Sequence, residues 1–248
     1  MTRIAVLGAR GRMGTASVRA IEATSDMSVV AEIDIDDDLQ GVVDNNAEIA
    51  LVFTPPKVAR EHVRWCIERG VHVVVGTSGF DEAAVDEIRA SVAGHGDVNV
   101  FVIPNLSIAG VLVTRFAEQA APHFESVEII EMHHPEKVDA PSGTALRTAE
   151  LMAQARAKAG CTPSPDATEL DPHGARGGRI EGIGVHAVRV RGFMSSQEVL
   201  LGVASELLTL RYDSVNREAL MPGVLASLRA VPTLAGVTVG LDAVLGLD

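Results

Sequence analysis

The sequence predicts an α/β protein: a Rossmann-like, doubly wound parallel sheet joined to an α+β domain with a mixed sheet. Up to about residue 106, short apolar segments rich in β-branched residues alternate with amphipathic segments, as strands and helices do in a parallel sheet. The first strand is followed directly by a glycine turn. Toward the carboxyl terminus several segments of alternating polarity follow one another, which favours an antiparallel or mixed sheet.

The amino-terminal segment has the order of a dinucleotide-binding unit. "TRIAVLG" is a strand, the turn has glycines at 8, 11 and 14, "TASVRAIEATSD" is a helix, and "MSVVAEID" is a strand that ends at Asp34. Such a turn lets the backbone approach a pyrophosphate, and Asp34 can accept hydrogen bonds from the ribose hydroxyls. The spacing is G-x-x-G-x-x-G, so the alternative is a turn that only lets a helix pack tightly on a strand.

The charges around this turn leave the choice of cofactor open. Asp34 suits NADH, since a carboxylate repels the additional phosphate of NADPH. Arg10 or Arg12 could bind that phosphate and offset the repulsion, although either could be a solvated surface residue. NADH and NADPH are therefore both expected cofactors at this stage.

The next three strands are expected at 48–53, 71–76 and 98–104, each followed by a turn and a helix. Ligands of doubly wound sheets bind beyond the carboxyl ends of the strands. The turns after these strands are therefore candidates to border the nicotinamide, although each could be an ordinary turn. Their residues are Phe53, Thr54, Gly76, Thr77, Ser78, Ile103, Pro104, Asn105 and Leu106.

The second half begins with an expected helix at 108–124 and a strand at 126–134. A helix at 143–160, a polar loop, three strands between 182 and 214, and a helix at 216–231 follow. We expect the last helix and the terminal segment to return to the first domain. The predicted domains are 1–106 with 216–248, for the dinucleotide, and 107–215, for the substrate.

The stretch "EMHHPEKVDAPSGTA", residues 131–145, carries the main candidate chemistry. His133 and His134 end a strand with their side chains on opposite faces, so they should differ in role. Lys137 follows in a loop. The next helix begins at "PSGT", where unpaired amide groups and the hydroxyls of Ser142 and Thr144 favour a carboxylate.

These residue types together predict a small substrate that carries carboxylate and accepts a hydride and a proton, such as a cyclic imine. A histidine can act as a general acid near neutral pH, and Lys137 can contact an anion or donate a proton. Taken singly, each histidine could be a capping or packing residue. A metal site is not expected, because His133 and Glu136 lack a convincing third ligand nearby.

Composition restricts the other functions. Of the 248 residues 47% are hydrophobic, yet no apolar run approaches the roughly 20 residues that span a bilayer. The amino terminus lacks the features of a signal peptide, so a cytoplasmic protein is expected. A net charge of −12 and 3% aromatic residues argue against a nucleic-acid partner. Cys66 and Cys161 form no disulfide or metal pattern and are expected to be free thiols.

The chain resembles the dihydrodipicolinate reductase family along nearly its whole length. The blocks that carry the resemblance are "GARGRMG", "GTSGF", "IPNLSIAG" and "EMHHPEKVDAPSGTA", of which the last is the most specific. The resemblance implies NAD(P)H-dependent reduction of 4-hydroxy-tetrahydrodipicolinate, a cyclic dicarboxylate, in diaminopimelate and lysine synthesis. It also implies a homotetramer built through the sheet of the second domain, and domain closure that excludes water.

The resemblance also implies roles for single residues. His133 would be the general acid or base and Lys137 its proton-donating partner, and substrate would be contacted by His134, Ser142, Gly143 and Thr144. Besides Asp34 and the turns named above, the cofactor would contact Gly8, Ala9, Arg10, Gly11, Arg12 and Met13. Val52 and Ser196 depart from the family pattern, since an acid and a histidine are expected there, and this puts the support of the cofactor loop and the packing of the second domain in doubt.

Two other functions remain open. One is a different Rossmann-type dehydrogenase, acting on an amino acid through an imine, which would not need the whole 131–145 block. The other is a non-catalytic dinucleotide sensor, which would tolerate the loss of His133 or Lys137. Turnover of the cyclic substrate distinguishes the family's reaction from both.

Overall fold

The computed structural model describes residues 1–247 and divides the chain into two units. Unit 1 is Met1–Ile108 together with the carboxyl-terminal segment that starts at Leu220, and unit 2 is Ala109–Ala219. These divisions lie beside the domain boundaries expected at 106/107 and 215/216. Within the described residues, no helix combines the length and the apolarity that crossing a membrane would require.

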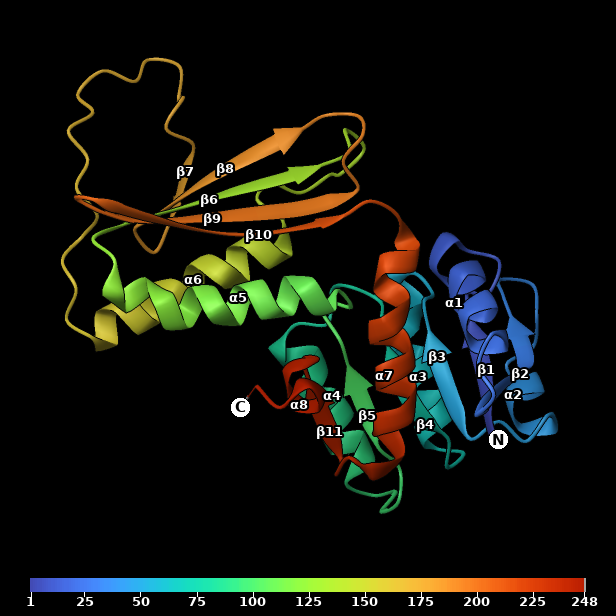
Figure 1. The fold of residues 1–248 in the computed structure, drawn as a ribbon. Coiled ribbons are helices and arrows are strands. Elements are labelled where there is room, and N and C mark those ends of the chain that lie inside the picture. Colours follow the sequence, from blue (N-terminus) through green and yellow to red (C-terminus); the bar gives the residue numbers. More distant parts are fainter. Residues whose placement is uncertain (248) are drawn as a thin grey trace. The chain divides into compact units, whose positions relative to one another are not determined.

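Unit 1 contains a sheet of six parallel strands, which confirms the predicted fold class (Figure 1). The inner strands are continuous apolar runs: β3 and most of β4 are fully buried because helices cover both faces of the sheet. In sheet order the strands are β11 (Val237–Val239), β5 (Val100–Val102), β4 (His72–Val75), β3 (Ile49–Val52), β1 (Thr2–Leu7) and β2 (Met27–Ile33).

The helices of unit 1 form two layers. Figure 1 shows α1 and α7 in front of the sheet and α3 and α4 behind it. The α-helices are α1 (Arg12–Glu22), α2 (Gln40–Asp44), α3 (Pro56–Ile67), α4 (Glu82–Val92), α7 (Met221–Ala230) and α8 (Asp242–Leu245). Short 3-10 helices span Arg217–Leu220 and Val231–Thr233.

The strand order reverses beside β1, and this reversal determines where unit 1 can bind a ligand. From β1 the chain passes to β2 on one side and then to β3 on the other, so β1 and β3 are neighbours. Loops that leave these two strands diverge, and the space beyond their carboxyl ends is the usual ligand position in such sheets. Gly8 and Phe53 are the residues at those ends.

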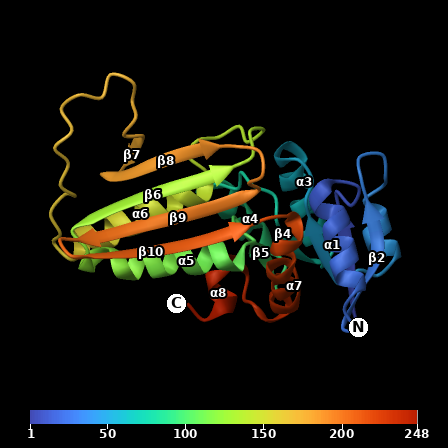
Figure 2. The ribbon, with the colours of Figure 1, turned by 45° about the horizontal axis from the view of Figure 1, so that its top comes forward.

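Unit 2 contains a mixed sheet covered on one face by α5 (Ile108–Ala120) and α6 (Gly143–Lys158), which lie behind the strands in Figure 2. Only β6 and β8 pair in parallel; the other neighbours are antiparallel. The alternation of β6 places Val127, Ile129, Glu131 and His133 on one face. The strands in sheet order are β10 (Glu206–Ser214), β9 (Ser195–Val203), β6 (Ser126–His133), β8 (Ile183–Arg189) and β7 (Gly178–Ile180).

Several element boundaries differ from those expected. The helix predicted at 108–124 is α5 followed by a 3-10 turn, Ala121–His123, in which Pro122 has no amide hydrogen to continue the helix. The helix predicted at 216–231 is divided in the same way, because Pro222 starts α7 after a 3-10 turn. Four short elements, α2, β7, β11 and α8, were not predicted as helices or strands, since too few residues form them to show a period.

Candidate functional site

The glycine turn of unit 1 has the geometry of a phosphate cradle. Gly8 has φ +83°, and a Cβ there would lie 2.9 Å from the carbonyl oxygen of Phe53. A Cβ on Gly14 would lie 2.1 Å from the carbonyl oxygen of Gly8, so α1 can approach the turn only because this residue is glycine. Gly11 and Arg12 are exposed at the amino-terminal end of α1, so its first amide groups face solvent. These residues fit a dinucleotide.

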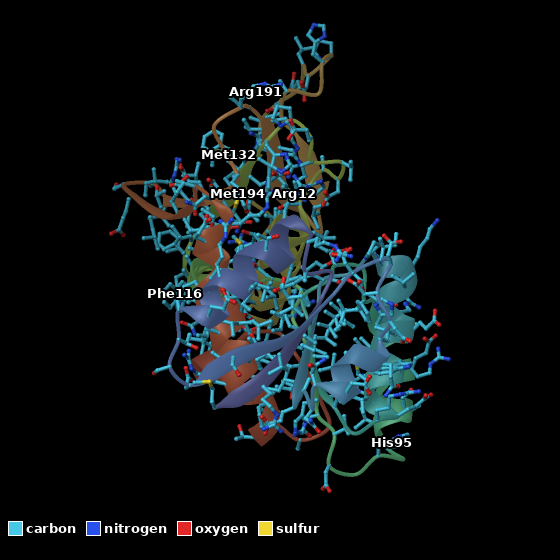
Figure 3. All side chains as sticks on the ribbon, turned by 90° about the vertical axis from the view of Figure 1, so that its right-hand side faces the viewer. Arg12, His95, Phe116, Met132, Arg191 and Met194 are labelled. Atoms are coloured by element: carbon cyan, nitrogen blue, oxygen red, sulfur yellow. The ribbon has the colours of Figure 1, made fainter. Side chains whose placement is uncertain are left out.

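Two of the residues labelled in Figure 3, Arg12 and His95, show at which end of unit 1 the glycine turn lies. Arg12 is the first residue of α1, and His95 lies in the loop between α4 and β5. They lie at opposite ends of unit 1 in that view. The cradle is thus at the carboxyl edge of the parallel sheet, as the strand order requires.

Asp34 lies beside the turn as an ionised carboxylate. Its oxygens accept hydrogen bonds from the backbone nitrogens of Ile35, at 2.9 Å, and of Arg10, at 2.7 Å. These bonds lower the pKa of Asp34. The guanidinium of Arg10 does not pair with Asp34 but with Asp37, at 2.9 Å. Arg10 is therefore bound through both its backbone and its side chain to the acidic segment after β2.

The turns after β3 and β4 are linked to the glycine turn and to each other. The ring of Phe53 lies where a Cβ of Gly76 would be, at 2.2 Å. The hydroxyl of Thr77 donates to the carbonyl oxygen of Thr54 at 2.8 Å. Ile103 donates its backbone N–H to Val75, which aligns the end of β5 with that of β4.

The candidate cofactor residues beyond Ile103 follow the same edge of the sheet. Ser107 donates its backbone N–H to the side-chain oxygen of Asn105 at 2.9 Å, which shapes the turn after β5. Leu106 is buried against α7, where a Cβ on Gly223 would lie 2.1 Å from its carbonyl oxygen. Pro104 and Ser78 are exposed.

His133 in unit 2 is buried and hydrogen-bonded. It ends β6, and its Nδ1 lies 2.6 Å from Oε2 of Glu131, two residues earlier on the same face. Glu131 is fully buried, and both its oxygens accept hydrogen bonds from the guanidinium of Arg189, at 2.8 and 2.7 Å. Burial raises the pKa of Glu131, but the bonds from His133 and Arg189 outweigh this and lower it to about 2.

His134 differs from His133, as the alternation of the strand predicts. It is half-buried at the start of the loop, and its Nδ1 lies 3.3 Å from Oε2 of Glu136 without forming a hydrogen bond of good geometry. Lys137 donates to Asp139 at 2.7 Å. Burial raises the pKa of Asp139, and the bond from Lys137 contributes to a net lowering.

The start of α6 completes this part of unit 2. The hydroxyl of Ser142 accepts from the backbone nitrogen of Ala145 at 3.2 Å and so caps the helix. Its own backbone nitrogen donates to Glu131 at 3.1 Å. Gly143 is exposed, and Thr144 is half-buried and hydrogen-bonded to the phenol of Tyr212. The carboxylate of Glu131 therefore joins His133 to the first turn of the helix.

Three residues around this site were not among the predicted ones. They are Glu131, Arg189 and Tyr212. These residues are far apart in the sequence and are brought together by the pairing of strands in the sheet of unit 2. Glu131 could have been recognised, because it lies two residues before His133 in a strand and so shares its face. Arg189 and Tyr212 gave no such signal, since their strands could not be paired from the sequence.

The two departures from the family pattern are accommodated in the structure. Val52 is fully buried between β1 and β4 as part of the core of unit 1. Ser196 is buried on β9, and its side chain is hydrogen-bonded to Asp213 of the neighbouring strand. In the part of the chain that the structure describes, no group of three His, Cys, Asp or Glu side chains is placed to hold a metal ion.

Both halves of the chain match models of one family. Residues 2–106 match the model described as dihydrodipicolinate reductase, N-terminus, and residues 110–245 match the model of its C-terminus. Among curated relatives, the 4-hydroxy-tetrahydrodipicolinate reductase of Thermobifida fusca is 50% identical over 248 residues, which is 100% of both chains. That of Streptomyces coelicolor is 47% identical over 246 residues, 99% of this chain and 98% of the relative.

A solved structure shares the whole fold. The dipicolinate-bound dihydrodipicolinate reductase from Paenisporosarcina sp. TG-14 is 33% identical, with a TM-score of 0.85 over 98% of this chain and 99% of the other. A probable dehydrogenase from Thermotoga maritima, 14% identical with a TM-score of 0.62 over 99% of this chain and 93% of the other, shares the fold alone. The matches to both family models and to full-length relatives show that this chain belongs to the dihydrodipicolinate reductase family.

Proposed function

We propose that this protein reduces 4-hydroxy-tetrahydrodipicolinate to tetrahydrodipicolinate with a reduced nicotinamide cofactor, in the synthesis of diaminopimelate and lysine. The observation that carries the proposal is the arrangement around Glu131, whose carboxylate joins His133 to the first turn of α6. The site so formed combines a proton-exchanging ring with an anion-binding helix start. The names of the full-length relatives and of the dipicolinate-bound neighbour agree with this chemistry.

The substrate would bind at the start of α6. The first turn of α6 carries the positive end of the helix dipole, and the exposed Gly143 lets a carboxylate approach the backbone. Thr144 would add a hydroxyl contact, and Ser142 would keep the turn in place as the cap. His134 and the ammonium group of Lys137 would contact the remaining anionic and polar groups of a dicarboxylate.

His133 and Lys137 would supply the proton. Loss of the 4-hydroxyl group as water would first leave a conjugated imine. When bound, NAD(P)H would supply the hydride that adds to C4 of this ring, and the resulting enamine would then be protonated. Nδ1 of His133 donates to Glu131, so Nε2 is the nitrogen that can exchange a proton. Lys137, held in place by its hydrogen bond to Asp139, would deliver the proton or replenish it.

The test separates catalysis from cofactor binding. His133→Gln and Lys137→Ala should each lower kcat by about 100-fold or more, because each removes a proton-transfer group. The affinity for NADH, measured by fluorescence titration, should remain that of the parent. If the parent binds NADH but does not turn over the substrate, the protein is a dinucleotide sensor or a dehydrogenase for another imine. Equal loss of cofactor affinity in both variants would place these residues in the cofactor site.

For the cofactor, the side-chain pairing favours NADH over NADPH. The segment after β2 carries Asp34 and three further acidic residues at 36–38, which would repel a 2′-phosphate. The guanidinium that could attract this phosphate, that of Arg10, is paired with Asp37. Cofactor contacts are proposed for the glycine turn, Asp34 and the turns that follow β3, β4 and β5. Comparing kcat/KM for the two cofactors tests this choice, and a higher value with NADPH would contradict it.

We further propose a homotetramer assembled through the sheet of unit 2. One face of this sheet is covered by α5 and α6 (Figure 2). The other face carries half-buried apolar side chains between charged ones. These apolar residues include Ile130, Val188 and Leu200, on three neighbouring strands. Light scattering should give four times the chain mass of 26.1 kDa, and the mass of a monomer would refute the proposal.

A further inference from the structure

We propose that Arg189 and the buried carboxylate of Glu131 form a charge pair that positions His133 and sets the pH range in which it exchanges protons. This inference rests on the proposed function, in which His133 is the proton-exchanging group. Neither residue is proposed to touch the substrate. Both would be positioning residues that act through His133.

Four hydrogen-bond donors converge on the carboxylate of Glu131. Its carboxylate is fully buried, where an unpaired charge would be costly. It accepts from His133, from both terminal nitrogens of Arg189 and from the backbone nitrogen of Ser142. A carboxylate with four donors has one orientation, and so has the imidazole bound to it.

The hydrogen bond to Glu131 also selects the tautomer of His133. With its pKa lowered to about 2, Glu131 is ionised and can only accept hydrogen bonds. The hydrogen between the two groups therefore belongs to Nδ1 of His133. Nε2 is left without a hydrogen in the neutral ring and carries one in the charged ring, so it alone exchanges the proton.

Arg189 also joins this pair to the loop that carries Lys137. Besides the fork to Glu131, its Nη2 donates to the carbonyl oxygen of Asp139 at 2.7 Å. Asp139 is the partner of Lys137. The pair thus connects the three parts of the proposed site: His133, the loop with Lys137, and the start of α6 at Ser142.

The charges around His133 predict how each variant changes its titration. The positive charge of Arg189 balances the negative charge of Glu131. The carboxylate of Asp139 also acts on His133, but it is paired with Lys137. The phenol of Tyr212, next to Glu131, is uncharged. Glu131→Gln leaves the positive charge of Arg189, which disfavours the imidazolium. Arg189→Met leaves the negative charge of Glu131, which favours it.

The experiment is a nitrogen-15 NMR titration of the histidines in the full chain, with the His133 signal assigned by its loss in His133→Gln. Relative to the parent, the midpoint for His133 should fall by about 1 pH unit in Glu131→Gln and rise by about 1 pH unit in Arg189→Met. The double variant, which again balances the charge, should return the midpoint close to that of the parent. Movement of both single variants in one direction, or of neither, would overturn the inference.

The matched control is Glu128→Gln. Glu128 is also on β6 and also pairs with an arginine and a histidine, Arg176 and His186, but on the opposite face of the sheet. This variant should leave the His133 midpoint in place, and a shift as large as that in Glu131→Gln would show a general effect of charge removal. If Arg189→Met does not fold, Glu131→Gln and the double variant still decide the question.

Kinetics give a second readout. Glu131→Gln should lower kcat by about tenfold or more without changing the affinity for NADH, and its pH–rate profile should move to lower pH. The NMR result does not need turnover. If the parent does not reduce the substrate, the proposed function fails while the titration still tests the pair. If the parent is active and the titration does not move, only the inference about the pair fails.

Discussion

At the scale of single residues, the sequence predicts which residues belong to a site better than it predicts which side chains they contact. The glycine spacing identified Gly8 and Gly14, because the absence of a side chain is itself the functional property. The role of Arg10 stayed open, since its pairing with Asp37 depends on how the turn after β2 is folded. Glu131 was missed because an acid within a strand is most often on the solvent face, and only the buried donors around it explain its position.

The pairing of Arg10 leads to a prediction about cofactor choice. Asp37→Ser frees the guanidinium of Arg10, which can then bind a 2′-phosphate. We expect the ratio of kcat/KM for NADPH to that for NADH to rise by about tenfold, which corresponds to one charge-assisted hydrogen bond. Asp36→Ser is the control, because it removes the same charge without removing the partner of Arg10. An equal change in both variants would mean that overall charge, and not the freed arginine, determines the preference.

At the scale of elements, long periodic segments were predicted and short or proline-divided ones were not. The first five strands of unit 1 and the helix α6 follow from hydrophobic pattern and a capping serine, whereas β11 was expected only as part of a terminal segment. The pairing of β6 with both β8 and β9 could not be predicted, because it depends on contacts between residues more than fifty positions apart. Much of the candidate site depends on that pairing, since it brings Arg189 to Glu131.

The carboxyl end of α6 offers a stability test at this scale. Arg156, in its last turn, is buried and donates to the carbonyl oxygens of Ala121, Phe124, Glu125 and Thr162. Arg156→Met leaves these groups without their donor and should cost about 3 kcal/mol of unfolding free energy in urea. Lys158→Met, an exposed change in the same turn, should cost little. Comparable losses would mean that the contacts of Arg156 add nothing to stability.

At the scale of the whole molecule, the buried carboxylate of Glu131 predicts loss of stability in acid. The pKa of Glu131 is lowered from 4.5 to about 2 on folding, so its contribution is complete above about 4.5 and is lost as the pH falls toward 2. We expect the unfolding free energy to fall by on the order of 2 kcal/mol between about pH 6 and about pH 3 from this group alone. Urea unfolding of the parent and of Glu131→Gln at both pH values measures this fall in unfolding free energy. A fall as steep in the variant would assign the acid sensitivity to other carboxylates.

The predicted two-domain fold and the predicted reductase chemistry both point to the same family along the whole chain. A parallel sheet with a glycine turn and a mixed sheet with a histidine–lysine block fold as two units, and both match models of the same family. The sequence could not show the hydrogen-bond network that joins His133, Glu131 and Arg189, because Arg189 lies on a strand that is distant in the chain from the strand of the other two.

The central claim is that this chain transfers a hydride to 4-hydroxy-tetrahydrodipicolinate. The most direct test is the mass spectrum of the product formed with NADH that carries deuterium at the transferred position of the nicotinamide. We expect a tetrahydrodipicolinate that has gained one deuterium, formed at the rate at which the cofactor is consumed. Consumption of the cofactor without label in this product, or no consumption at all, would contradict it.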